Sequence, residues 1–271
     1  MYQGFYNLAS GMLTQSRNLN VISNNMVNIQ TAGYKQDTMV SSTFGEEMMY
    51  RSARNGTGEP IPLATLSKIK TAAETYVNYD QGGFEQTDGI YDFALGGKGF
   101  FCVETPNGER YTRNGSFSAD EEGYLTLEGV GRVLSAEDQP IQIDNENFTV
   151  DERGNIIAVI TTGSETDSEE EIEILEYGTL KVVDFADYGQ LTKEEGGLFS
   201  TAQAPLEPAA GEEAAETGIV VLWKTLEKSN VNMVDEMTSM MSSQRALQSA
   251  AQVLRMYDQI MSKSVTDIGR L

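Results

Sequence analysis

The sequence of 271 residues contains no histidine and only one cysteine. Histidine is the commonest general base and metal ligand near neutral pH, so its absence excludes histidine-activated nucleophiles and histidine-ligated metal sites. A single cysteine excludes an intrachain disulfide and a multi-thiolate metal site. Cys102 lies in an apolar run beside Phe100 and Phe101, where we expect a buried and unreactive thiol.

Cationic residues are also scarce. Lysine and arginine number 19 against 41 aspartates and glutamates, which gives a net charge of −22. Nucleic acids and anionic membrane surfaces require cationic patches, so neither is an expected partner. No run approaches the roughly 20 apolar residues of a membrane span, and the N-terminus lacks the pattern of a cleaved secretory signal. We predict a protein that does not insert into a membrane and is either cytosolic or exported without signal cleavage.

Proline is confined to the middle of the chain, because all six prolines lie between Pro60 and Pro208. Two ends without proline around a middle segment that contains proline are typical of a helix, a β-rich domain and a second helix in that order. We therefore predict an α+β fold in which N- and C-terminal helices pair as a coiled coil, with a central β-rich domain. The predicted segments are an assembly helix with an extended connector over 1–75, the β-rich domain over 76–201, and a linker with the C-terminal assembly helix over 202–271.

Both ends carry a helical stripe with heptad-like spacing. Near the C-terminus, positions spaced alternately by four and three residues are mostly apolar, and neither glycine nor proline occurs between Ile219 and Ile268. Such a stripe usually packs on the core of its own domain. Here it runs for about ten turns, longer than a typical globular helix, and it has a counterpart at the N-terminus. We therefore predict that the two ends pack on each other and on other subunits.

The predicted assembly interface combines the two stripes. Two of its members, Gln244 and Asp258, are polar and are interpreted as positions that set the register between helices. The full predicted set is Phe5, Ala9, Met12, Leu19, Met26, Met237, Met240, Gln244, Leu247, Leu254, Asp258, Met261 and Val265.

Motifs of known chemistry are weak. The run Gly96-Gly97-Lys98-Gly99 lacks the spacing of a phosphate-binding loop and predicts a tight turn before a strand. The acidic turns at 144–147 and 151–154 do not keep the register of a calcium loop. Asp88 and Asp92 form a carboxylate pair in principle, but nothing else indicates a sugar cleft. We predict no catalytic residue, cofactor or metal, and hence no enzyme.

The acidic run over 165–173 has two interpretations. A solvated loop is the ordinary one, and a cation site is the alternative.

Short runs along nearly the whole chain match the order of one family's signatures. Together they resemble the flagellar rod and hook family of axial proteins, with Val27 as a departure where alanine is usual. The runs are Ala9-Ser10-Gly11-Met12, Ser23-Asn24-Asn25-Met26-Val27-Asn28, Thr31-Ala32-Gly33-Tyr34-Lys35, Gln81-Gly82, Asp92-Phe93-Ala94-Leu95-Gly96-Gly97-Lys98-Gly99-Phe100-Phe101, Tyr111-Thr112-Arg113-Asn114-Gly115-Ser116-Phe117, Phe148-Thr149-Val150-Asp151, Gly178-Thr179-Leu180, Leu226-Glu227-Lys228-Ser229-Asn230-Val231, Glu236-Met237-Thr238 and Gln244-Arg245-Ala246.

A second departure lies before the last helix. Where the family tends to have Gln-Gly ahead of Leu226-Glu227, this chain has Trp223-Lys224. Losing a glycine there changes the backbone freedom at the entry to the helix.

The resemblance implies a structural subunit of the bacterial flagellar rod. Such a subunit polymerises through its terminal helices into the axial tube that transmits torque from motor to hook. The implied partners are copies of itself, other rod and hook subunits and the type III export apparatus, and the implied location is the basal body. We also expect the free termini to be disordered and to fold on docking. The alternatives are a hook-type axial protein and a helical-armed adaptor or carbohydrate-binding module.

Overall fold

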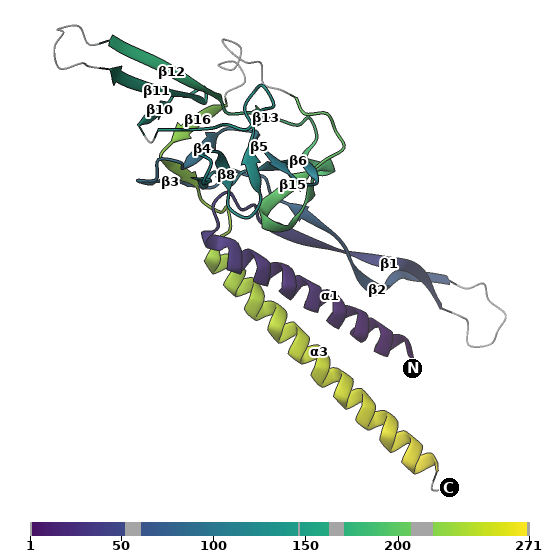
Figure 1. Ribbon diagram of the computed structural model, residues 1–271. Coiled ribbons are helices and arrows are strands. Elements are labelled where there is room, and N and C mark those ends of the chain that lie inside the picture. The colour runs from purple at the N-terminus through teal and green to yellow at the C-terminus, as the bar shows by residue number, and fades with distance from the viewer. Residues whose placement is uncertain (1, 52–60, 146, 163–170, 207–218, 270–271) are drawn as a thin grey trace. The chain divides into compact units, whose positions relative to one another are not determined.

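The computed structural model describes residues 2–51, 61–145, 147–162, 171–206 and 219–269. It is an α+β structure with a helix at each end and strands between them, which confirms the predicted class (Figure 1). The chain divides into two compact units. The helical unit comprises Met1–Val27, Asp37–Asn78 and Asn232–Leu271, and the β unit comprises Asn28–Gln36 and Tyr79–Val231.

The elements of the helical unit are two helices and one hairpin. Their bounds are α1 Tyr2–Val27, β1 Asp37–Arg51, β2 Ile61–Val77 and α3 Met233–Ile268.

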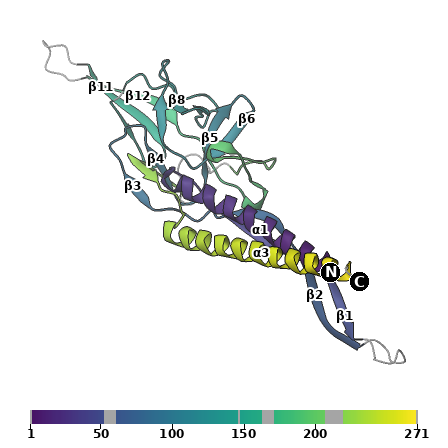
Figure 2. The same ribbon diagram turned by 90° about the horizontal axis from the view of Figure 1, so that it is seen from below.

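In the helical unit, α1 packs against α3 and against the hairpin. Figure 2 shows the two helices side by side. At the start of α3, the Asn232 side chain accepts a hydrogen bond from the backbone N–H of Val234 at 3.0 Å, and Asp235 and Glu236 place carboxylates in the first turn. Both features satisfy or complement the exposed N–H groups of a helix N-terminus.

The hairpin is a two-stranded antiparallel ribbon. It runs in register from Asp37 opposite Val77 to Arg51 opposite Ile61. Two register shifts, after Val40 and after Met49, accommodate the longer second strand.

The β unit contains short strands and three 3₁₀ turns. Their bounds are η1 Asn28–Gln30, β3 Phe84–Gln86, β4 Phe93–Gly96, β5 Phe100–Thr105, β6 Gly108–Thr112, β7 Phe117–Ala119, β8 Leu125–Leu127, β9 Gly131–Val133, β10 Phe148–Val150, β11 Asn155–Thr162, β12 Glu171–Thr179, β13 Val182–Val183, η2 Tyr188–Gln190, β14 Thr192–Lys193, η3 Glu195–Gly197, β15 Leu198–Ser200, β16 Val220–Trp223 and β17 Thr225–Glu227.

The strands of the β unit pair antiparallel throughout. The largest sheet has the order β14-β15-β6-β5-β9-β8-β7, with β13 added to β5. A second sheet has the order β10-β11-β12, and β16 and β17 near the C-terminus pair with β4 and β3. The C-terminal part of the chain therefore completes small sheets begun by residues before position 100.

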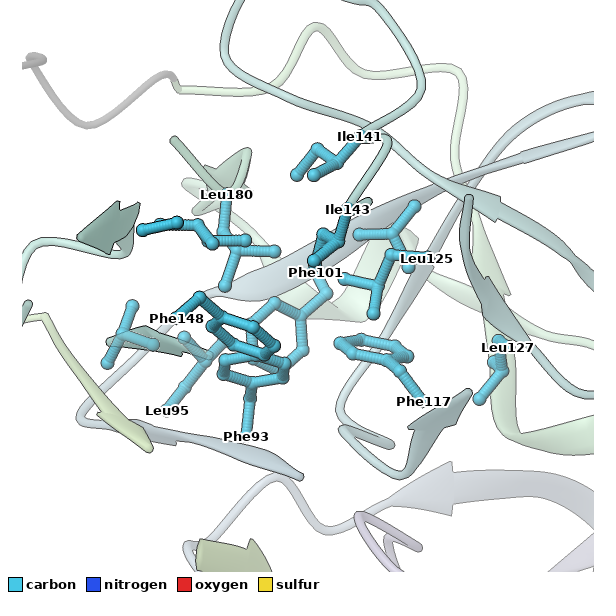
Figure 3. Packing of buried hydrophobic residues seen from close by; sticks show 14 of the residues in the cluster. Phe93, Leu95, Phe101, Phe117, Leu125, Leu127, Ile141, Ile143, Phe148 and Leu180 are labelled. Atoms are coloured by element: carbon cyan, nitrogen blue, oxygen red, sulfur yellow. The ribbon is translucent and has the colours of Figure 1, made fainter. Parts of the chain in front are cut away.

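The core of the β unit is built from phenylalanine and aliphatic side chains on facing strands. Phe101 and Phe117 are in edge-to-face contact, with ring centroids 5.3 Å apart, and Phe93 lies 5.9 Å from Phe117 (Figure 3). Such aromatic pairs add to the free energy gained by burying apolar area. Cys102 is fully buried, as predicted.

Strands β5 and β6 form a hairpin, with Gly108 at a φ of 101° directly after Pro106-Asn107. The predicted turn before a strand is confirmed. The run Gly96-Gly97-Lys98-Gly99 forms a bend before β5. Most of the acidic run 165–173 lies outside the described residues. Among the described helices, none combines the length and the apolar character that crossing a bilayer needs.

Candidate functional site

The helix pair of the helical unit is held in register by buried polar side chains. The Asn25 side-chain amide donates to Glu236 Oε1 at 2.8 Å, and Asn18 donates to Ser243 Oγ at 3.2 Å. Asn25, Glu236 and Ser243 are at most 5 % exposed. A buried polar group is costly without its partner, so these contacts disfavour other registers of the two helices.

Asn25 also ties the end of α1 to the start of β1. Its side-chain oxygen accepts from the backbone N–H of Asp37 at 2.9 Å, and its amide donates to the Asp37 carbonyl at 2.8 Å. One side chain therefore fixes both the helix pair and the strand that follows.

The two contacts between the helices lie seven residues apart on each helix and run in opposite directions. Helices α1 and α3 are therefore antiparallel, with one heptad of α1 matched to one heptad of α3. Continuing this register places the start of α1 opposite Gln259 and Ile260. The last two turns of α3 extend past α1, and Val265 there is 68 % exposed.

The predicted interface residues divide into two groups. Half-buried members are Ala9, Met12, Leu19, Met26, Met240, Leu247, Leu254 and Met261, whereas Phe5, Met237, Gln244, Asp258 and Val265 are exposed in the single chain.

The least exposed residues of α3 include Glu236, Ser243 and Tyr257. Each lies one position before an exposed member of the predicted set, namely Met237, Gln244 and Asp258. The predicted stripe followed the spacing of the apolar residues, which places Met237 and Gln244 in the stripe and Glu236 and Ser243 one position outside it. The seven-residue spacing of Asn18 and Asn25, matched by that of Ser243 and Glu236, is the signal that would have identified these polar residues.

Helix α3 also exposes large apolar side chains away from these residues. Val234, Met237 and Met241 follow one another at spacings of three and four residues, and so do Val253, Met256 and Ile260; all six are at least 42 % exposed. Exposed apolar side chains that line up along a helix indicate an interaction surface.

The β unit contains a buried ionic group that we term the junction cluster: Lys35, Arg113 and Glu227. Lys35 Nζ lies 2.7 Å from Glu227 Oε1, and Arg113 Nη1 lies 3.2 Å from Glu227 Oε2. Lys35 and Glu227 are each 1 % exposed. Burial lowers the pKa of Lys35, and the charge and hydrogen bond of Glu227 oppose that effect.

Backbone groups complete the junction cluster. Lys35 Nζ also donates to the Asp80 carbonyl at 2.9 Å, Arg113 Nη2 donates to the Gly97 carbonyl at 2.8 Å, and the Gly82 N–H donates to Glu227 Oε1 at 3.0 Å. Buried ion pairs are weak evidence for stability, but removing one partner is strongly destabilising. The arrangement is suited to fixing chain segments in place, not to proton transfer.

The cluster holds a connector, residues 28–36, onto the β unit. The Gly33 N–H donates to the Glu227 carbonyl at 2.7 Å, and Gln36 N–H donates to Asn230 Oδ1 at 2.8 Å. Lys193 Nζ donates to the Lys35 carbonyl at 2.8 Å and lies 3.8 Å from the Tyr34 ring centroid. The connector is thus bound by backbone, amide and cationic groups from two later segments.

Gly33 is required at its position for two reasons. Its φ is 66°, and a Cβ atom there would lie 2.2 Å from the Arg113 carbonyl carbon. Any other residue would strain the backbone and displace the strand end that supplies Arg113.

The other candidate residues form no second site. Asp92 accepts a hydrogen bond from the Thr87 hydroxyl at 2.6 Å, which stabilises a turn near Asp88. Across the described ranges, no group of three or more acidic or cysteine side chains is placed to hold a metal ion.

Three family models match separate parts of the chain. "Flagella basal body rod protein" matches residues 5–35, "Flagellar hook protein FlgE/F/G D1 domain" matches 94–158, and "Flagellar basal body rod FlgEFG protein C-terminal" matches 224–267. Together they match more than half of the sequence. The chain belongs to the flagellar basal-body rod family.

Relatives in this family align over almost their full length. The flagellar basal-body rod protein FlgG of Buchnera aphidicola subsp. Schizaphis graminum is 29% identical over 265 residues, covering 94% of this chain and 95% of that protein. The flagellar hook-basal body complex protein FlhO of Bacillus subtilis is 29% identical and aligns over 100% of both chains. The flagellar basal-body rod protein FlgF of Caulobacter vibrioides is 29% identical, covering 97% of this chain and 96% of that protein.

The junction cluster draws one residue from each of the three matched segments. Lys35 ends the first, Arg113 lies in the second and Glu227 lies near the start of the third. Segments that identify the rod family thus meet at one buried ionic group.

The Trp223-Lys224 departure lies at the start of the third matched segment. Lys224 has a φ of 53°, a left-handed conformation that glycine adopts without strain. Its carbonyl accepts from the Thr87 N–H at 2.9 Å, and its Nζ lies 4.3 Å from the Trp223 ring centroid. Trp223 in turn donates its indole N–H to the Ile90 carbonyl at 2.8 Å. The chain therefore keeps the turn without the glycine.

We expect Lys224→Gly to be more stable than Lys224→Ala by about 1 kcal/mol. Both variants lose the contact with Trp223, but only glycine relieves the left-handed strain. Urea unfolding of the two variants measures the difference. Equal stabilities would show that Lys224 carries no backbone strain.

Proposed function

We propose that this chain is a structural subunit of the flagellar rod and that α1 and α3 pair as a coiled coil in the rod wall. The observation that carries the proposal is the antiparallel helix pair, which is set in register by buried polar contacts one heptad apart. The exposed apolar side chains of α3 then supply contacts between subunits. A tube that grows at one end needs such a heterologous, non-closing interface.

The residues predicted from the two stripes remain the proposed assembly interface, in two roles. The half-buried members, such as Leu247 and Leu254, pack the helix pair of one subunit. The exposed members, such as Met237, Gln244 and Asp258, contact neighbouring subunits. The division into segments 1–75, 76–201 and 202–271 likewise stays a prediction.

Proposed partners are other copies of the chain and other axial proteins of the flagellum. A hook-type role is not favoured, because relatives that align over almost the whole chain include the rod proteins FlgG and FlgF. We further propose a role without catalysis, export by the flagellar apparatus without cleavage of a signal peptide, and a final location in the basal body.

Location in the rod is tested by electron microscopy of purified basal bodies that carry a tagged version of this chain. We expect the tag along the rod between the motor and the hook. Finding it only on the hook, or on no part of the basal body, would contradict the proposal.

In the free subunit, we expect the terminal helices to be largely unfolded. A single helix of this kind is marginally stable in water without tertiary contacts. Pairing α1 with α3 through a partly polar interface adds few such contacts. Folding on docking costs several kcal/mol but confines assembly to the growing end. The junction cluster lies wholly in the β unit, so the connector 28–36 should remain ordered.

Circular dichroism and amide hydrogen exchange of the full-length monomer measure this expectation. The helical signal should fall well short of the 26 residues of α1 and 36 of α3, whereas residues 28–36 should be protected. A strong helical signal that disappears when residues 1–27 and 232–271 are removed would contradict it.

A further inference from the structure

A cavity of about 410 Å³ lies beside the junction cluster in the β unit. Arg113 and Lys98 supply cationic groups to its lining, and Tyr79, Phe100 and Tyr188 supply aromatic ones. The Tyr79 and Tyr188 rings are stacked, with centroids 5.1 Å apart. The volume is within the usual range of sites that bind small groups.

Arg113 has one buried donor that its own chain does not satisfy. Its two Nη groups bond to Glu227 and to the Gly97 carbonyl, but its Nε–H has no hydrogen-bond partner among the described residues. The side chain is only 5 % exposed. A buried donor without an acceptor is costly, so an acceptor that reached this edge of Arg113 would stabilise the site.

The adjacent bend adds a second cation. Gly97 and Gly99 have φ values of 98° and 126°, and this conformation presents Lys98 at the cavity. Lys98 is exposed and forms no salt bridge with any described residue. Asp80 also lines the cavity, so the lining carries two cations, Lys98 and Arg113, and one carboxylate. This local excess of positive charge contrasts with the chain's net charge of −22.

We propose that this cavity binds a carboxylate group, which a neighbouring copy of the chain supplies as an aspartate or glutamate side chain in the assembled rod. A carboxylate matches the edge of a guanidinium, where Nε–H and Nη–H point in the same direction. Phosphate is the poorer fit, because the glycine-rich bend leads into strand β5 and not into a helix N-terminus of the kind that binds phosphate. The chain's 41 acidic residues against 19 basic ones make a carboxylate the group that a neighbouring copy offers most readily.

The identity of the neighbour rests on the proposed rod function, but carboxylate binding itself does not. Binding is therefore tested on the full-length monomer, by NMR titration with N-acetyl-glutamate amide. Its neutral counterpart, N-acetyl-glutamine amide, and inorganic phosphate are titrated in parallel. We expect saturable shifts of the Arg113 Nε–H signal and of the Gly97–Gly99 amides with the glutamate probe alone, with a dissociation constant on the order of 1 mM.

Variants locate the binding. Lys98→Gln should weaken it at least about threefold, as expected for loss of one exposed ion pair. Lys224→Gln removes the same charge at an exposed lysine that does not line the cavity, and it should leave the affinity unchanged. Equal responses to the glutamate and glutamine probes would overturn the carboxylate assignment, as would stronger binding of phosphate or equal effects of the two variants.

Carbodiimide cross-linking of purified basal bodies tests the neighbour. The reagent joins the Lys98 amine to a carboxylate in direct contact as an amide, and takes up the water released. We expect a link from Lys98 to an acidic residue of a second copy in basal bodies and not in monomers. Lys98→Arg keeps the charge without a reactive amine and should abolish the link. If Lys98 is linked only within its own chain, the neighbouring copy is not the source of the carboxylate.

Discussion

Glu227→Gln is expected to lower the free energy of unfolding of the β unit by about 3 kcal/mol or more. The substitution leaves Lys35 and Arg113 as buried cations without a counter-charge, and breaking a buried ion pair typically costs about 3–5 kcal/mol. Glu227 is 1 % exposed, so water cannot replace the lost carboxylate. Denaturant unfolding followed by the fluorescence of Trp223, the only tryptophan, measures the change.

Glu85→Gln is the matched control for this variant. Glu85 lies on β3, the strand that pairs with β17, and its carboxylate is 3.1 Å from Lys228 Nζ, but both side chains are more than half exposed. Exposed pairs contribute no more than about 1 kcal/mol. Equal effects of the two substitutions would contradict the role given to the junction cluster.

The junction cluster also determines how stability varies with pH. Burial lowers the pKa of Lys35 below its ordinary 10.5, so the unfolded chain holds this proton more tightly than the folded one. The contribution of Lys35 to stability therefore rises as the pH increases toward 10.5. Glu227 opposes the lowering, so in Glu227→Gln this rise should be steeper and should begin at lower pH. Unfolding at several pH values between 7 and 10.5 checks the expected difference from the unmodified chain.

Leu254→Asp is expected to reduce incorporation into the rod at least tenfold, while the β unit still folds. Leu254 is half-buried on the side of α3 that also carries Glu236, Ser243 and Leu247, and an aspartate there buries a charge with no partner. A penalty of about 1.4 kcal/mol already gives a tenfold effect. The measurement is the amount of the variant in purified basal bodies relative to its amount in the cell.

Two control variants distinguish the effect of position 254 from the effect of an added negative charge. Leu254→Met keeps the apolar volume and should be incorporated normally. Gln252→Asp adds the same charge at an exposed position two residues away and should be tolerated. Normal incorporation of Leu254→Asp would show that the helix pair does not use this side of α3 in the rod.

The sequence predicted the helices well because their signals are local and repetitive. The apolar spacing and the absence of glycine and proline specify α3. The glycine-rich run at 96–99 likewise indicated the bend before β5. These features depend on residues close together in the chain.

The parts that escaped prediction depend on residues far apart. Lys35 and Glu227 are separated by 192 positions, and neither belongs to a periodic pattern. The family resemblance named the runs that contain them, but not that these runs meet. The polar contacts between the helices were not predicted either, because Asn25, Glu236 and Ser243 lie outside the apolar stripes. Apolar spacing alone does not reveal polar residues whose cost of burial is offset by partners on another helix.

The most direct test of the account is cysteine cross-linking between α1 and α3 in purified basal bodies. The double variant Asn18→Cys/Ser243→Cys introduces two cysteines at positions that are in contact between the helices. The native Cys102 is fully buried and is not expected to react with the cross-linker. The proposed pairing predicts a link between positions 18 and 243, through a disulfide or a short thiol cross-linker, in rod-assembled subunits. It predicts no link between cysteines placed at the exposed Ser16 and Gln244 of the same chain. Absence of the first link, or equal yields of the two, would contradict the pairing of the terminal helices in the rod.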